Sequence, residues 1–268
     1  GNWTAQNKVR PGIYINFTSR GGGSLTPGQR GTLAACKALS WGPVGEIMTI
    51  HAGDSLKPFT GYDITEPQAR FLREAFKGTD VSGGPTTVLL YRPQAAGAAA
   101  ASASLGEGGV TVTALYPGTR GNDIAVTVTE DVDEAGLFTV ATLVDGVEAD
   151  SQRAKTPAEL VPNSWAAFSK EGALAATAGV TLTGGADGTV NAAAYAAFLE
   201  ALEPCSFDVL AYDGEDSAVN QALIAFVKRI SAQEGRYAQL VTTGAANADS
   251  RFVINSRSGA VLEDGSTL

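Results

Sequence analysis

Few residues in this sequence have the type and spacing that catalysis requires. His51 is the only histidine, so a serine-hydrolase triad would have to use it as the general base. It follows an apolar stretch that we predict to be a strand, and Asp54 comes three residues later. The sequence contains no Gly-x-Ser-x-Gly motif that would present a nucleophile. We therefore interpret His51 as an ordinary polar residue at the end of a strand.

The carboxylates and cysteines also lack the spacing of a known site. Asp131 and Asp133 lie in a turn-like stretch, but Thr142 stands where a calcium loop of the EF-hand type needs Glu. Cys36 and Cys205 are far apart and neither belongs to a CxxC pair. We interpret both as reduced, buried small residues, with a disulfide or a nucleophile as the alternatives. The sequence therefore predicts no catalytic residue, no metal and no cofactor.

The composition indicates a folded protein of low charge. The 268 residues are 44% hydrophobic and 18% charged, with a formal net charge of −9. This apolar fraction supports a sizeable core and excludes disorder of the whole chain. The acidic balance argues against a nucleic acid or an anionic membrane as partner, because both require clusters of Lys and Arg. No apolar run is long enough to span a membrane and the first residues lack a secretion signal, so we expect a cytoplasmic location.

Strand and helix patterns alternate in two separate parts of the chain. Apolar alternation or unbroken apolar runs predict strands, and apolar residues three or four positions apart predict helices. The predicted strands are 13–17, 46–50, 86–91, 207–212, 239–243 and 251–255, and the predicted helices are 66–77, 191–203 and 217–234. Strands that alternate with helices favour the α/β class with a mixed, mostly parallel sheet.

A stretch of different composition interrupts this alternation. Residues 94–104 are almost entirely Ala, Gly and Ser, which is typical of a linker. Short strands at 110–114, 124–128 and 138–143 follow and predict a small antiparallel β module, and a short helix containing Trp165 is predicted within 156–168. The predicted domains are an extended N-terminal arm (1–20), an α/β domain (21–93 plus 184–268) and an inserted β domain with its linkers (94–183).

The predicted arm carries one apolar face. Its strand places four apolar side chains on that face, Val9, Ile13, Ile15 and Phe17. Three glycines at 21–23 separate the strand from the rest of the chain. Such a strand can pair with an exposed sheet edge of a neighbouring subunit through backbone hydrogen bonds. We therefore expect the arm to act between subunits.

A glycine-rich turn precedes the helix predicted at 191–203. It consists of Leu182-Thr183-Gly184-Gly185-Ala186-Asp187-Gly188, in which Gly184, Gly185, Asp187 and Gly188 are the distinctive residues. Glycine adopts positive φ angles without strain, so a tight turn is our interpretation. An anion docked at the start of the following helix is the alternative.

Two stretches resemble contractile phage tail sheath proteins. Residues 7–17, together with Gly31-Thr32-Leu33-Ala34-Ala35 and Trp41-Gly42-Pro43, resemble the amino-terminal region of sheaths from Gram-positive myophages, defective prophages and phage-tail-like bacteriocins. Residues 182–188, with the helix and the strand that follow, resemble the LxGGxDG turn and core α/β domain of the family. That domain is likened in topology to subtilisin but carries no protease site.

The resemblance implies a structural function. Sheath subunits assemble as stacked hexameric rings around a tail tube and contract to drive the tube through a cell envelope. The implied partners are other sheath subunits, the tail tube and baseplate proteins, with no nucleic acid and no membrane, in a virion tail or tail-like particle assembled in the host cytoplasm. Sheath proteins continue into a carboxy-terminal domain, which we expect this sequence to lack, so that it forms no sheath alone. A glycan- or receptor-binding surface module and a cryptic hydrolase on a subtilisin-like scaffold are the alternatives.

Overall fold

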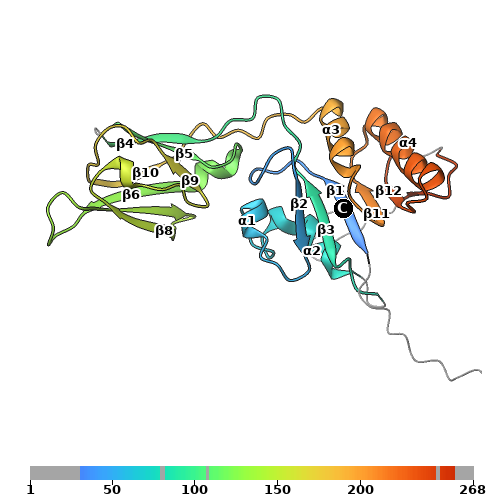
Figure 1. Cartoon of the computed structure of the whole chain (residues 1–268), viewed down its shortest axis with the longest axis horizontal. Helices are drawn as coiled ribbons and strands as arrows, with labels where there is room; N and C mark the ends of the chain where they lie inside the picture. Colours follow the sequence, from blue (N-terminus) through green and yellow to red (C-terminus); the bar gives the residue numbers. More distant parts are fainter. Residues whose placement is uncertain (1–30, 79–81, 107–108, 246–247, 257–268) are drawn as a thin grey trace, which may run out of the picture.

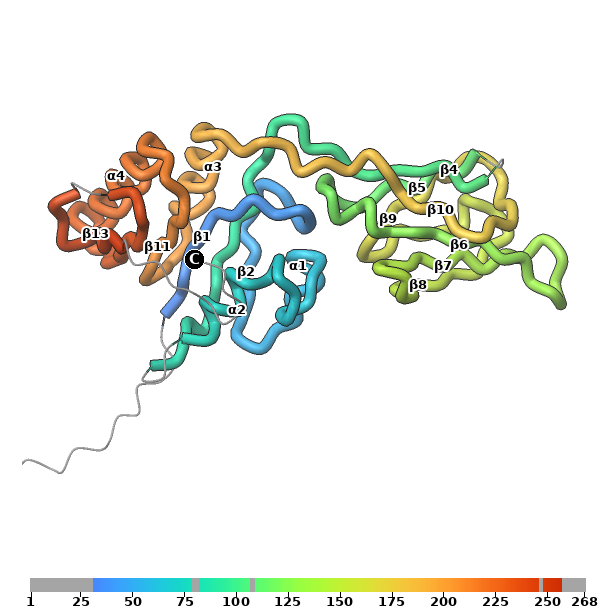
Figure 2. The backbone as a smooth tube through the Cα atoms, turned by 180° about the vertical axis from the view of Figure 1, so that it is seen from behind, coloured from blue at the N-terminus to red at the C-terminus, as the bar shows by residue number. Residues whose placement is uncertain are grey.

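The computed structural model describes residues 31–78, 82–106, 109–245 and 248–256. The predicted arm, with its strand at 13–17, lies outside these residues. Figure 1 shows two bodies side by side along the longest axis, a helix-containing sheet domain and an all-β domain. Two chain segments cross between them, and Figure 2 shows the same two segments from behind.

The sheet domain has a six-stranded sheet with the order β13-β12-β11-β1-β3-β2. Its strands are β1 (Thr32–Cys36), β2 (Ile47–His51), β3 (Thr87–Tyr91), β11 (Val209–Tyr212), β12 (Gln239–Thr242) and β13 (Val253–Asn255). Neighbouring strands are parallel except β2, which runs antiparallel to β3 at the edge. The predicted mixed, mostly parallel α/β sheet is thereby confirmed.

Helices cover both faces of this sheet. One face packs against α3 (Ala192–Leu202) and α4 (Ser217–Gln233), whose buried side chains include Phe198 and Leu223. Asn191 and Asp216 cap these helices by accepting hydrogen bonds from backbone N–H groups of the first turn. The other face packs against three shorter elements, α1 (Lys57–Thr60), the 3-10 turn η1 (Pro67–Ala69) and α2 (Arg70–Lys77).

The all-β domain contains two antiparallel sheets with a shared core. One has the order β10-β6-β7-β8 and the other β4-β5-β9. The strands are β4 (Ser102–Leu105), β5 (Val110–Ala114), β6 (Ile124–Glu130), β7 (Phe138–Val144), β8 (Val147–Ala154), β9 (Ala166–Phe168) and β10 (Thr177–Thr181), with 3-10 turns η3 (Thr119–Asp123) and η4 (Pro157–Glu159). Alternate residues of β5 and β6, such as Val112 and Val126, point into the core and are fully buried.

The prediction of a helix within 156–168 is wrong. Only η4 is helical there, and β9 follows directly after Trp165. Asn163 accepts hydrogen bonds from the backbone N–H groups of Trp165 and Ala166, both at 2.8 Å, which turns the chain into the strand. Trp165 and Phe168 then bury their rings in the core of the β domain. Tertiary packing therefore overrides the local helix pattern.

The prediction of a linker at 94–104 is also incorrect at its end. Residues 102–105 form β4, and the residues before it are hydrogen-bonded to the returning segment. Ala96 and Thr189 exchange two backbone hydrogen bonds of 2.9 Å, and Ala99 and Ala186 exchange two more of the same length. The small side chains allow the two crossing segments to lie close together, so the connection is a pair of segments joined by isolated β-bridges rather than two independent linkers.

Candidate functional site

The junction between the two domains contains two buried arginines, Arg92 and Arg120. The glycine-rich motif lies here, on the returning segment. Asp187 accepts hydrogen bonds from the backbone N–H and the hydroxyl of Thr119, at 2.7 and 2.9 Å. Gly185 and the Asn122 side chain exchange two hydrogen bonds of 2.9 and 3.0 Å. The motif therefore ties the crossing segment to η3 at the base of the β domain.

Two positions of the motif require glycine, because a neighbouring backbone segment lies too close to leave room for a Cβ atom. Gly188 has a φ of +70°, and a Cβ there would lie 2.6 Å from the carbonyl oxygen of Ala96. A Cβ on Gly185 would lie 2.4 Å from the carbonyl oxygen of Gly118. Gly184 has a φ of +83° but open space around it. Gly184 and Gly188 both have the positive φ that glycine adopts without strain, but the segment is not a tight turn, because Thr183, Ala186 and Thr189 pair in succession with Ser102, Ala99 and Ala96 along an extended path.

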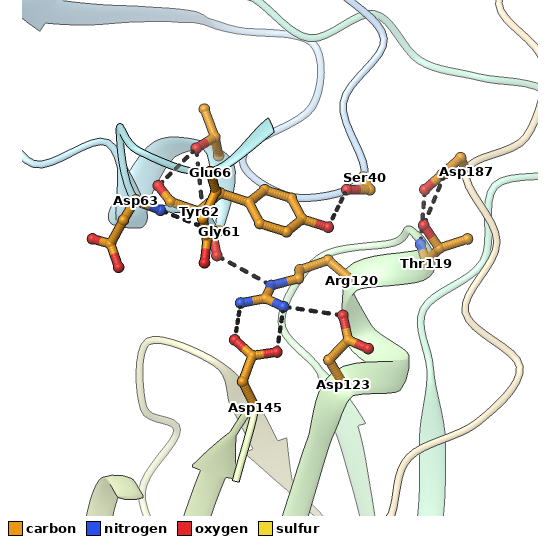
Figure 3. A network of polar contacts seen from close by, with 11 residues as sticks. Ser40, Gly61, Tyr62, Asp63, Glu66, Thr119, Arg120, Asp123, Asp145 and Asp187 are labelled. Atoms are coloured by element: carbon orange, nitrogen blue, oxygen red, sulfur yellow. Dashed lines mark hydrogen bonds and ion pairs between the residues drawn. The ribbon is translucent and has the colours of Figure 1, made fainter. Parts of the chain in front are cut away.

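Arg120, on η3, joins the β domain to the sheet domain (Figure 3). Its side chain is only 4% exposed. Nε donates to the carbonyl oxygen of Gly61 at 3.1 Å, and the two Nη atoms donate to the two carboxylate oxygens of Asp145 at 2.7 and 2.6 Å. Nη1 also donates to Asp123 at 3.0 Å. The guanidinium also lies over the Tyr62 ring, 4.4 Å from its centroid. One buried cation therefore holds contacts on both sides of the junction.

The electrostatics of this cluster favour the ion pair. Burial alone would lower the pKa of Arg120, but the hydrogen bonds from its guanidinium to Asp145 and Asp123 outweigh burial and raise it. The same hydrogen bond lowers the pKa of Asp145 below its ordinary value. Both groups are therefore charged at neutral pH, in the bidentate geometry that suits an Arg–carboxylate pair.

Trp41 joins the domains from the opposite direction. It lies in the loop between β1 and β2 of the sheet domain, but its ring is buried in the apolar core of the β domain. The ring contacts Tyr116 edge-on at 5.3 Å and Trp165 at 4.9 Å between centroids. A Cβ on Gly61, whose φ is +80°, would lie 2.8 Å from Trp41, so only glycine fits beside the indole. The core of the β domain is thus completed by a residue of the other domain.

Arg92 adds a second buried cation at the junction. It follows β3 and is 3% exposed. Its two Nη atoms donate to the carbonyl oxygens of Gly42 and Pro117, at 2.7 and 2.6 Å. Burial lowers the pKa of Arg92, and the charge of Asp187 opposes that effect. Arg92 therefore satisfies backbone oxygens from both domains that would otherwise be buried without partners.

The residues considered for catalysis in the sequence analysis make hydrogen bonds that stabilise strands and turns. His51, at the end of β2, binds the Thr87 hydroxyl through Nδ1 at 3.2 Å, and its backbone N–H donates to Asp54 at 2.8 Å. Asp131 accepts backbone N–H bonds from Asp133 and Glu134 and stabilises a turn. Among the described residues no group of His, Cys, Asp and Glu could hold a metal ion.

Both cysteines are free thiols; Cys36 is buried as predicted, whereas Cys205 is only partly buried. Burial raises the pKa of Cys36 to about 12, which keeps it protonated.

No helix in the described ranges is long and apolar enough to cross a membrane. Val9, Ile13, Ile15 and Phe17 lie outside the described residues.

The sequence pattern missed the residues that build the junction. Trp41 entered the sequence analysis only through the resemblance, and no pattern singled out Arg92 or Arg120. The one available signal was Trp41 itself, because a tryptophan between glycine-containing turns rarely remains solvent-exposed. Its burial partners, however, come from a different domain.

Comparison with known proteins identifies the domains. The family model of the tail sheath protein Gp18 domain III N-terminal region matches residues 30–92, and the phage tail sheath protein β-sandwich domain matches residues 95–187. The phage tail sheath protein central domain matches residues 188–268. The borders between these matches coincide with the two crossing segments at the junction.

Relatives and solved structures agree with these matches. The phage-like element PBSX protein XkdK and the uncharacterized protein YqbK, both of Bacillus subtilis, are 34% and 36% identical over 98% of this chain. Sheath tail proteins of Desulfitobacterium hafniense (40% identity, TM-score 0.80, 96% of this chain) and Listeria innocua (32% identity, TM-score 0.76, 90% of this chain) share the fold. This chain spans 58% of both curated relatives, and 59% and 53% of the two solved chains. Since three sheath domains follow one another along the sequence and the solved sheath proteins have the same fold, the chain belongs to the phage tail sheath protein family.

Proposed function

We propose that this chain is a structural subunit of a contractile tail sheath, which assembles as stacked hexameric rings around a tail tube and contracts to drive that tube through a cell envelope. The observation that carries the proposal is the series of three sheath-domain matches over residues 30–92, 95–187 and 188–268. The proposed partners are other sheath subunits, the tail tube and the baseplate.

The junction suits a subunit that transmits force. A contracting sheath rearranges its subunits without separating them, so each subunit must resist bending between its own domains. Arg120, Arg92 and Trp41 cross the junction and are all nearly inaccessible to solvent. The paired crossing segments add backbone hydrogen bonds to these contacts. A load on one domain would therefore reach the other through buried contacts.

The two alternatives find less support in the described residues. A hydrolase with a subtilisin-like topology would need a carboxylate to orient the ring of His51, but Asp54 accepts from the His51 backbone N–H, and the hydrogen bond of the ring is to the Thr87 hydroxyl. A glycan-binding module on the β domain would need aromatic faces of that domain open to solvent. The groove of about 470 Å³ beside the junction is lined by Trp41 and Trp165, but these rings are only 1% and 7% exposed. Both features favour a structural function.

We further propose that residues 1–20 act between subunits, with Val9, Ile13, Ile15 and Phe17 on the face that packs against a neighbour. A strand supplied by a neighbouring chain keeps subunits connected through backbone hydrogen bonds while they rotate.

Electron microscopy tests the function. The chain extended to the length of its relatives should form tubes or stacked rings, and removal of residues 1–18 should abolish them. Circular dichroism of both proteins provides the control for folding. Normal sheaths from the deleted protein would overturn the role of the arm, and a failure of the extended protein to form any ordered assembly would overturn the proposed function.

A further inference from the structure

Arg92 is buried with part of its guanidinium group unpaired. A guanidinium group carries five N–H donors. One donor on each Nη atom of Arg92 binds a carbonyl oxygen, that of Gly42 or that of Pro117. The other three donors make no hydrogen bond to any residue that the structure describes. Buried polar groups nearly always have partners, so a side chain that is 3% exposed should have a further acceptor nearby.

Arg92 forms part of the wall of a small cavity at the junction. The cavity has a volume of about 10 Å³, which is close to the space that one water molecule needs. Most of its lining side chains are apolar, and the polar ones are Arg92, Asp187 and the exposed Gln94. A buried cation and a carboxylate therefore share the wall of one water-sized cavity.

Asp187 does not bind Arg92 directly. Its two carboxylate oxygens accept the hydrogen bonds from Thr119, which hold the carboxylate against η3 (Figure 3). No hydrogen bond or ion pair joins these two described side chains. The charge of Asp187 nevertheless raises the pKa of Arg92 against the effect of burial. The carboxylate is thus near enough to act on the guanidinium group but too far away to bind it.

The charges on the wall favour a neutral molecule in this cavity. An anion would be repelled by Asp187, and a cation would be repelled by Arg92. A molecule with both an acceptor and a donor suits both groups, because it accepts from the guanidinium N–H groups and donates to a carboxylate oxygen, which has a second lone pair available. The volume leaves room for nothing larger than water.

We propose that one water molecule occupies this cavity and bridges the guanidinium group of Arg92 to the carboxylate of Asp187. Two hydrogen bonds accepted from Arg92 and one donated to Asp187 give this water the three partners that are typical of buried waters. Arg92 follows β3 of the sheet domain, and Asp187 lies on the returning segment. The water therefore adds a further link across the junction and gives Asp187 a second role beside the binding of Thr119.

High-resolution crystallography of the 268-residue chain tests this site, which does not depend on sheath assembly. We expect one density peak within about 3.2 Å of both a guanidinium nitrogen of Arg92 and a carboxylate oxygen of Asp187. In Arg92→Met the peak should be lost, because the variant keeps the apolar stem but removes all five donors, and apolar cavities stay dry. The matched control, Arg229→Met, removes an exposed arginine and should keep the peak.

Four results would overturn the proposal. The first is the absence of a peak between Arg92 and Asp187 in the parent chain, and the second is a direct ion pair between the two side chains. The third is a peak that persists in Arg92→Met. The fourth is an anomalous signal at the site in crystals soaked in bromide, which would assign the cavity to an anion. If Arg92→Met does not fold, the structure of the parent chain and the bromide soak decide without it.

Discussion

The Nε atom of Arg120 donates a hydrogen bond of 3.1 Å to the carbonyl oxygen of Gly61, across the junction between the β domain and the sheet domain. Gly61 also packs against Trp41, which enters the core of the β domain from the other side. The two crossing contacts therefore meet at one glycine. Because Gly61 has a positive φ and no room for a Cβ, this meeting point depends on the backbone itself.

Arg120→Ala should destabilise the protein by about 3 kcal/mol, because hydrogen bonds to charged groups and the stacking on Tyr62 are lost together. Chemical denaturation at pH 7 measures the change. The matched control is Arg229→Ala, which removes an exposed arginine that pairs with Glu203 and Glu234 on the surface. The control should have no measurable effect. Equal destabilisation by both variants would show that Arg120 is no more than another surface ion pair.

Trp41→Ala should cost about 3–5 kcal/mol, as expected for a large aromatic removed from a packed core. Because the lost contacts couple the two domains, each domain of the variant should unfold separately. Calorimetry should therefore resolve two unfolding transitions in the variant and one in the parent chain. Tyr237→Ala removes an aromatic side chain that is 74% exposed and should change neither the stability nor the number of transitions. A variant that still unfolds in one transition would contradict the coupling of the domains through Trp41.

The Arg120–Asp145 pair should make stability depend on acid pH. The pKa of Asp145 in the folded protein lies below its unfolded value of 3.8. A group of this kind stabilises the fold above the unfolded pKa and loses that contribution as the pH falls through the folded pKa. Asp145→Asn should therefore lower the melting temperature at pH 7, and the difference from the parent chain should shrink below about pH 4. A difference that stays constant down to pH 2 would exclude ionisation of Asp145 as its source.

The elements of the sheet domain could be predicted from sequence because their signals are local. The unbroken apolar run of β3 and the apolar stripe of α4 each identify one element without reference to another. The strands of the β domain were harder to predict, since β8 is mostly polar and exposed along its length and shows no apolar pattern. Local pattern also misled at Trp165, where the core of the β domain decides the conformation.

The junction could not be predicted for a different reason. Arg120 bonds to Gly61 and Arg92 bonds to Pro117, and these contacts join residues from separate elements whose proximity arises only after both domains have folded. The Ala-rich composition of 94–104 is equally typical of a free linker and of two closely paired backbones. Only the hydrogen bonds of Ala96 and Ala99 to the returning segment distinguish the two.

Replacement of residues 95–187 by a short Gly/Ser linker should leave the sheet domain folded. The strands β1, β2, β3, β11, β12 and β13 keep all their neighbours in such a protein. Trp41 would then lose its partners in the β domain, so Trp41→Ser is included to avoid an exposed indole. A cooperative thermal transition, followed by circular dichroism, is the expected result. Its absence would mean that the two domains form a single folding unit.

The alternation of apolar and polar residues in the predicted arm strand predicts which of its side chains are needed for assembly. In the chain extended to the length of its relatives, Ile13→Ser, Ile15→Ser and Phe17→Ser together should prevent tubes and rings, because they remove the apolar face that would pack on a neighbour. Tyr14→Ser with Asn16→Ser alters the other face of the same strand and should leave assembly intact. Negative-stain electron microscopy and sedimentation compare the two proteins. If both variants assemble, or if both fail, the side chains of the arm do not act through one face of a strand, and the proposed pairing between subunits has to be abandoned.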